Sequence, residues 1–331
     1  MNETDQPISN ADIDRYLPSL THFLKTIIDV KRPPYPTNIA KLNLALLQIG
    51  IDPNVHLSNG DIWYHRIRAT GDNAIDQEYV DRLKPTINPD IRNQDGCNAL
   101  HRQANYQTID LFLRLGVSPN VRCDDGRTPI YWVVNNLPAL QLLLQHGADP
   151  NVEDIDGVTP LFLARTPETI ELLIKAGNQP NHQDKIGRTP IFSVVENPPA
   201  LQLLLQHGAD PNIQDNYGVT PLFLANTPET IDILLKVGAD PNHQDRDGRT
   251  VLHYKRHPAL AQLLLQHGFN PNLQDHDGQT PLYQAVQNGS IDLIKLLLKF
   301  HANPIIKDNQ GKTPLSYAKS PEIVELLRLY S

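Results

Sequence analysis

Histidine and cysteine are the side chains in this chain best suited to metal binding, and the sequence has 13 histidines and 2 cysteines. The histidines recur in two settings, after LLLQ at His146, His207 and His267 and after Pro-Asn at His182 and His243. If these phrases belong to stacked repeats, members two repeats apart lie roughly 20 Å from each other, whereas bonds to a zinc ion are about 2 Å long. We therefore expect no metal site among them.

The two cysteines, Cys97 and Cys123, form no C-x-x-C motif, so neither a zinc site nor a thioredoxin-like site is predicted. Two thiols are also too few for the disulfide framework of a small secreted protein. We expect both to remain reduced.

Catalytic motifs are missing from the sequence as well. It contains no G-x-S-x-G, no P-loop and no G-x-G-x-x-G, so neither acyl transfer nor nucleotide binding is indicated, and no cofactor is expected. An enzyme in residues 1–92 is the alternative, because the stretch 62–85 is irregular. That alternative requires Asp61, His65 and Glu78 to converge in a pocket.

Charge and hydropathy exclude several classes of partner. The 331 residues carry 29 Lys and Arg against 37 Asp and Glu, a formal net charge of -8, so nucleic acid and anionic membranes are not expected partners. The N-terminal stretch is acidic, with no apolar segment of a signal peptide, and no run of about 18 apolar residues predicts a membrane span. We expect a cytoplasmic protein, unless a dedicated machine exports it into the cytoplasm of a host cell.

A repeat of 30 to 33 residues positions all of these side chains. Its marker glycines are Gly96, Gly126, Gly157, Gly187, Gly218, Gly248, Gly278 and Gly311, and most of them precede x-T-P-[IL]. A second phrase, such as LLLQHGADPN at 142–151, closes each unit. A fixed period of this length is typical of repeat architectures.

Each phrase predicts a local structure. Threonine before proline indicates a helix start, with the hydroxyl capping free N–H groups and proline in the first turn. In the unit that begins at Glu153, a short helix over PLFLA is followed by a second helix from Thr166-Pro167-Glu168 to Gly177. The D-x-x-G stretch after it predicts a tight turn. Helices this short are marginal alone, so the units must stack, with leucines such as 142–144 in the contact.

These phrases together resemble the ankyrin repeat, clearly over roughly 93–331. The resemblance implies an all-α solenoid of short antiparallel helix pairs with hairpin fingers, with about nine to ten repeats, whose fingers and first helices line a concave face. It also implies that the asparagines of the D-P-N phrase, Asn151, Asn212 and Asn242, brace the fingers. The units are shorter than the 33 residues of the family, and the family's histidine in T-P-L-H survives at His101 and His253 only. Aromatic packing is expected to replace its hydrogen bonds at Tyr131, Phe162, Phe192, Phe223 and Tyr283.

The repeats suggest a division of the chain. We expect a flexible tail at 1–10, capping helices and degenerate repeats at 11–92, regular repeats at 93–306 and a C-terminal capping repeat at 307–331.

Within this frame, a duplication shows which positions are free to vary. Residues 127–187 and 188–248 are identical at 44 of 61 positions, and the differences include positions at the expected finger tips and inner helices. Exposed apolar residues at polar tips suggest contact with a partner, although isolated ones are common on protein surfaces. The predicted protein-binding residues are Arg127, Trp132, Ile155, Arg165, Lys185, Ile186, Arg188, Tyr217, Asn226, Arg246, Arg249, Lys255 and Arg256.

The basic members of this set predict a partner protein with an acidic patch, and the apolar members predict its anchors. We therefore expect a monomeric, non-enzymatic adaptor or inhibitor, similar to bacterial ankyrin proteins that act on a host or cognate target. Self-assembly through an exposed end of the stack is the further alternative.

Overall fold

The computed structural model describes residues 47, 52–54, 62, 67–69, 73–101, 103–255 and 257–330. The predicted first helix near residue 10 lies outside them, as does most of the degenerate repeat before residue 73. The chain divides into two compact units, residues 1–152 and 153–331. The boundaries expected at residues 10, 92 and 306 stay predictions.

Unit 1 contains four described helices: α3 (Asn73–Leu83), α4 (Tyr106–Arg114), α5 (Ile130–Val133) and α6 (Leu137–Gln145). Helix α4 packs against both α3 and α6, and α5 packs against α6. Of the predicted contact leucines, Leu142 and Leu143 are buried, and Leu144 is half-buried.

Unit 2 repeats a pair of helices, one short and one of nine residues. The pairs are η2 (Pro160–Leu163) with α7 (Pro167–Lys175), η3 (Pro190–Ser193) with α8 (Pro198–Gln206), α9 (Pro221–Leu224) with α10 (Pro228–Lys236), α11 (Val251–Tyr254) with α12 (Pro258–Gln266), α13 (Pro281–Gln287) with α14 (Ile291–Lys299), and η4 (Pro314–Tyr317) with α15 (Pro321–Leu329).

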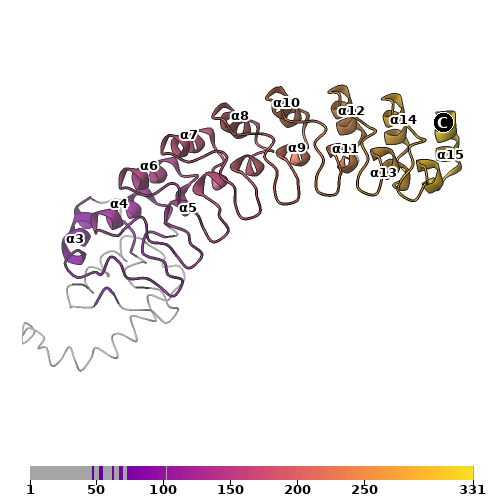
Figure 1. Ribbon diagram of the computed structural model, residues 1–331. Helices are drawn as coiled ribbons and strands as arrows, with labels where there is room; N and C mark the ends of the chain where they lie inside the picture. Colours follow the sequence, from indigo (N-terminus) through magenta and orange to yellow (C-terminus); the bar gives the residue numbers. More distant parts are fainter. Residues whose placement is uncertain are drawn as a thin grey trace, which may run out of the picture. The chain divides into compact units, whose positions relative to one another are not determined.

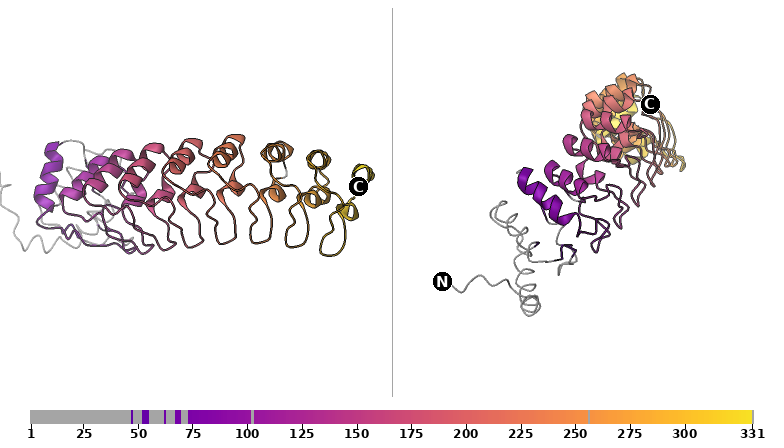
Figure 2. Two further views of the ribbon diagram at one scale, coloured as in Figure 1. Left: turned by 45° about the horizontal axis from the view of Figure 1, so that its top comes forward. Right: turned by 90° about the vertical axis from the view of Figure 1, so that its left-hand side faces the viewer.

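Within unit 2, short helices pack against short helices and nine-residue helices pack against nine-residue helices. The short helix η2 contacts η3, α9 contacts η3 and α11, and among the longer helices α8 contacts α7 and α10. The loops between pairs project together on one side (Figures 1 and 2). From residue 73 on, the described chain contains helices, turns and bends, and no strand. The predicted all-α solenoid of helix pairs is confirmed. No described helix combines the length and the apolar character needed to cross a membrane.

Helix boundaries follow the predicted signals, with one correction. Helix α7 begins at Pro167, with the Thr166 hydroxyl accepting the N–H of Thr169 at 3.4 Å. Gly177 follows its end with a φ of 103°, a left-handed conformation that glycine adopts without strain. No threonine hydroxyl caps η2, η3, α9, α13 or η4 as predicted, whereas Thr250 and His253 form a capping box at α11. Before η2, the carbonyl of Thr159 takes the N–H of Phe162 at 3.1 Å, and its hydroxyl is buried without a hydrogen-bond partner.

The position of the T-P-L-H histidine is more polar than expected. Phe162 and Phe223 pack edge-on against His182 and His243, as the aromatic exchange predicts. The tyrosines at this position also donate hydrogen bonds, from the Tyr131 hydroxyl to Val152 O at 2.5 Å and from the Tyr283 hydroxyl to Ile306 O at 2.7 Å.

Candidate protein-binding site

Each finger of unit 2 turns around one aspartate. In the first finger of unit 2, Asp154 Oδ1 accepts the N–H groups of Asp156 and Val158 at 2.9 and 3.0 Å. The same pair of bonds recurs at Asp184, Asp215, Asp245, Asp275 and Asp308. Because the carboxylate holds the turn itself, the predicted turn role of the D-x-x-G aspartates is confirmed.

Backbone hydrogen bonds join each finger tip in unit 2 to the next. Lys185 N donates to Asp156 O at 2.8 Å, Asn216 N to Ile186 O at 2.8 Å, and Arg246 N to Tyr217 O at 2.9 Å. The bonds fix the register of neighbouring tips, so side chains at the tips of successive fingers form a row.

Five predicted binding residues share this row, which we call the fingertip row: Ile155, Lys185, Ile186, Tyr217 and Arg246. Its three apolar members are 55%, 42% and 64% exposed, in chain order. Both cations are exposed as well. The structure therefore brings together apolar groups and positive charges on four consecutive fingers.

Asparagines brace the bases of the fingers. Asn212 Nδ2 donates to Gly238 O at 2.9 Å, and its Oδ1 accepts Asp240 N at 2.8 Å. Asn242 Oδ1 likewise accepts the N–H of Asn270 at 2.8 Å. One amide thus spans two successive repeats, and the expected bracing role is observed at both residues.

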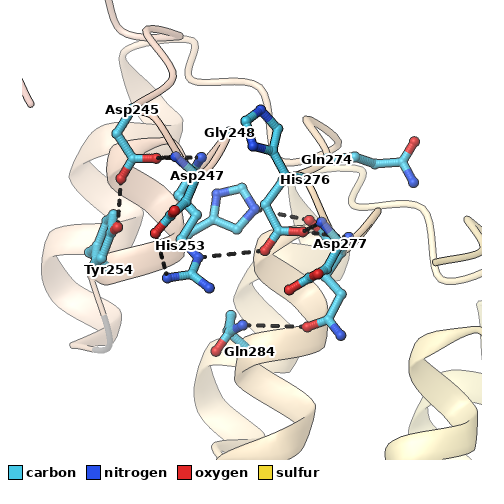
Figure 3. A network of polar contacts seen from close by, with 12 residues as sticks. Asp245, Asp247, Gly248, His253, Tyr254, Gln274, His276, Asp277 and Gln284 are labelled. Atoms are coloured by element: carbon cyan, nitrogen blue, oxygen red, sulfur yellow. Dashed lines mark hydrogen bonds and ion pairs between the residues drawn. The ribbon is translucent and has the colours of Figure 1, made fainter. Parts of the chain in front are cut away.

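Two other predicted arginines pair with the aspartate of the following finger. Arg188 Nε lies 3.4 Å from Asp215 Oδ2, and Arg249 Nε lies 3.6 Å from Asp275 Oδ2. Both carboxylates are nearly fully buried. In the polar network of Figure 3, the Tyr254 hydroxyl donates to Asp245 Oδ2 at 2.6 Å. These arginines help to hold the fingers and leave less charge for a partner.

Lys255 is buried, unlike the cations of the fingertip row. Its ammonium donates to Phe223 O at 3.0 Å and to Asn226 Oδ1 at 2.8 Å. Burial lowers the pKa of this lysine, and the carboxylate of Glu196 opposes the shift. The lysine and Asn226 therefore connect two repeats.

The remaining predicted residues are divided between the units. In unit 2, exposed Arg165 donates to Phe162 O at 2.8 Å. In unit 1, Arg127 pairs with Asp125 at 3.9 Å, and half-buried Trp132 packs edge-on against His101. Arg256 lies outside the described residues.

The recurrent histidines bond within the repeats. His182 Nε2 lies 3.0 Å from Gly157 O and His243 Nε2 lies 2.8 Å from Gly218 O, so each reaches the preceding finger. His146 Nδ1 lies 3.0 Å from Leu142 O in its own helix. The contacts give each of these histidines a structural role.

The cysteine prediction is wrong. Cys97 and Cys123 are joined in a disulfide, with their Cα atoms 4.6 Å apart. Buried His101 lies beside them, and its ligating nitrogen and both sulfurs lie within 4.8 Å of one another. Burial lowers the pKa of His101 to about 4, against backbone hydrogen bonds that raise it.

The C-x-x-C motif joins cysteines that are neighbours along the chain, so it does not reveal this cluster. The register of the repeats does predict that the two cysteines lie close together. Cys97 follows a marker glycine, and Cys123 starts the turn of the next finger. These two positions meet across fingers at Arg188 and Asp215.

Of the residues proposed for an enzyme site, Asp61 and His65 lie outside the described residues. Glu78 lies on α3, where its carboxylate pairs with Arg82 at 2.8 Å. One turn of helix separates this pair, which gives it the geometry of an ordinary surface ion pair.

Comparison with known proteins places this geometry in a family. The family model for ankyrin repeats (three copies) matches residues 71–154, 100–175, 162–245 and 251–330. No protein with a curated description matches the chain. Among solved structures, the chain is similar to the ankyrin repeat domain of Bcl-3, described as a unique member of the IkappaB protein family. Identity is 32%, the TM-score is 0.56, and the match covers 62% of this chain and 99% of the Bcl-3 chain. The chain belongs to the ankyrin repeat family.

Proposed function

We propose that this chain is a non-enzymatic adaptor or inhibitor that binds a partner protein through the fingertip row. Ankyrin repeats are protein-interaction modules, and the similar Bcl-3 domain comes from the IkappaB family. The observation that carries the proposal is the row itself: Ile155, Ile186 and Tyr217 are exposed on consecutive fingers, whose backbones are hydrogen-bonded in register.

The chemistry of the row defines the partner. Covering an exposed aliphatic or aromatic side chain contributes about 1.5–3 kcal/mol when burial is complete, so the apolar members act as anchors. Lys185 and Arg246 lie beside them and favour a partner with an acidic patch, which increases the rate of encounter. The row is already ordered by its backbone bonds, so little conformational entropy is lost on binding.

We extend the proposal to location and assembly. The protein works as a monomer in a cytoplasm, either its own or that of a host cell, on a cognate or host target. Light scattering over a range of concentrations is expected to give the mass of one chain. A mass that rises with concentration supports the self-assembling scaffold instead.

Affinity capture with matched variants tests the binding surface. The full chain and a variant with Ile155→Asp, Ile186→Asp and Tyr217→Asp are used on the native cytosol and on a host lysate. The control carries Ile305→Asp, Leu329→Asp and Tyr330→Asp, which alter three apolar residues that are more than half exposed and lie away from the row.

We expect the fingertip variant to lose a protein that the control retains, with both variants showing the circular dichroism of the parent chain. Equal capture by the parent chain and both variants contradicts the proposed surface. Titration with the purified partner then measures the loss of affinity. We expect the Kd of the fingertip variant to be at least 100-fold higher, since three anchors are removed.

A further inference from the structure

The disulfide occupies a position where other fingers use an ion pair. Cys97 comes directly after its marker glycine, as Arg188 does, and Cys123 starts the next finger, as Asp215 does. Arg188 and Asp215 form a cross-finger pair at 3.4 Å. The two thiols therefore replace a charged contact that unit 2 accommodates at Arg188–Asp215 and at Arg249–Asp275.

The turn at Cys123 also differs from the others. A thiol does not supply the two bonds that an aspartate carboxylate makes in the turns of unit 2 and that the Asn93 amide makes in the preceding finger. Asp125 Oδ1 instead accepts the N–H of Arg127 at 3.1 Å and closes this turn. Since aspartate braces the corresponding turns elsewhere, turn geometry does not account for a cysteine at this position.

His101 is the third member of the cluster. Its Nε2 points toward the finger of Cys123, at 3.4 Å from Arg127 O, the carbonyl that also accepts Cys123 N at 2.8 Å. Cys97, His101 and Cys123 are 4%, 4% and 7% exposed. Two sulfurs and one imidazole nitrogen form the donor set of a known class of zinc site, with the fourth position open.

Asn98, which orients the His101 ring, supports a role for this histidine as a metal ligand. At the equivalent histidine, His253, the Thr250 hydroxyl and N–H both lie 3.0 Å from Nδ1. At His101 the hydroxyl is replaced by Asn98 Oδ1, which lies 2.7 Å from Nδ1. This oxygen only accepts hydrogen bonds, and its position is set by Leu100 N at 3.1 Å and by Asn98 Nδ2 donating to Ser118 O at 2.8 Å.

An acceptor at Nδ1 favours the tautomer with hydrogen on Nδ1 and a lone pair on Nε2. Metal-ligating histidines are held by such a contact from the nitrogen that does not bind the ion. Asn98 N also lies 3.0 Å from Nδ1 and donates in the other tautomer. At His253 the Thr250 hydroxyl can donate or accept at Nδ1, whereas Asn98 Oδ1 at His101 can only accept. Arg127 O accepts from Nε2 in the other tautomer, at 3.4 Å, so a bound ion replaces this contact.

We propose that the reduced Cys97–Cys123 pair and His101 form a binding site for one zinc-like divalent ion between the two fingers. Two molecules of a small thiol reduce the disulfide and leave as one small disulfide. The ion then displaces one proton from each cysteine thiol, and water fills the fourth position. The sulfurs need to lie about 3.8 Å apart, as in a tetrahedral site with bonds near 2.3 Å. The disulfide and the ion are alternative links between the same fingers.

Cobalt titration of the reduced full chain tests this site directly. Co²⁺ replaces Zn²⁺ in tetrahedral sites and gives a thiolate-to-cobalt charge-transfer band in the near ultraviolet. We expect the band to saturate at one equivalent and to disappear when one equivalent of Zn²⁺ is added. A reduced chain that gives no such band, or one that does not saturate at one equivalent, overturns the proposal.

Two variants and a control separate the ligands. The double exchange Cys97→Arg with Cys123→Asp installs the ion pair seen at 188 and 215, so it is expected to fold and to lose the band. His101→Gln is expected to weaken Co²⁺ binding at least tenfold, and His253→Gln, in the equivalent position, is expected to leave it unchanged. A band that persists in the double exchange refutes the site, as does equal binding by the two glutamine variants.

Discussion

Replacing Gly218 by alanine is expected to destabilise the array far more than the same change at Gly208. Both glycines have positive φ, +78° and +85°, so each substitution places alanine in the left-handed region, which costs about 1–2 kcal/mol. Their surroundings differ. A Cβ at Gly208 meets nothing within 4 Å, whereas at Gly218 it lies 2.6 Å from Arg246 N and 2.9 Å from Asp245 Cα.

Backbone atoms of the next finger must therefore move when Gly218 is replaced. The move breaks the 2.9 Å bond from Arg246 N to Tyr217 O, a loss of about 1 kcal/mol, and overpacking adds about 1–3 kcal/mol. We expect Gly208→Ala to cost about 1–2 kcal/mol and Gly218→Ala about 3–6 kcal/mol. Urea denaturation followed by circular dichroism measures both free energies of unfolding. Equal losses for the two variants would refute the close stacking of the fingers.

Three further predictions concern polar side chains that bond between repeats. Burial lowers the pKa of His101 to about 4 from its ordinary 6.5, so the unfolded chain binds more protons between these values. The free energy of unfolding should fall by up to about 3 kcal/mol from pH 7 to pH 4, and urea midpoints should show a smaller fall for His101→Gln. Asn212→Ala removes the hydrogen bonds to Gly238 O and from Asp240 N. It should lower the free energy of unfolding by about 1–3 kcal/mol in the same assay. An unchanged urea midpoint would contradict the bracing role. Lys255→Ala should lower thermal stability, because the Phe223 carbonyl loses its donor, and a Tm equal to that of the parent would contradict this role.

The sequence predicts the helices well because their signals are local. Pro160 and Pro167 begin helices and Gly177 follows the end of one, as expected. The Thr159 cap was wrong for a local reason, since a single helical turn uses the N–H of Phe162 within its own backbone. Such a turn is too short for the ordinary capping rule to apply.

Contacts between repeats are harder to predict, even when the sequence singles out each of the residues that make them. The burial of Lys255 depends on the Phe223 carbonyl and on Asn226, about thirty residues earlier. The cysteine pair similarly depends on the register of two fingers. Once the ion pair of Arg188 and Asp215 is known, the same register places Cys97 against Cys123.

Hydrogen–deuterium exchange on the complex with a captured partner tests whether the partner binds through the fingertip row. We expect slower exchange in peptides that contain the tips at 154–157, 184–187, 215–218 and 245–248, with little change in α14 and α15. Protection confined to the longer helices, with the tips unchanged, would contradict binding through the fingertip row.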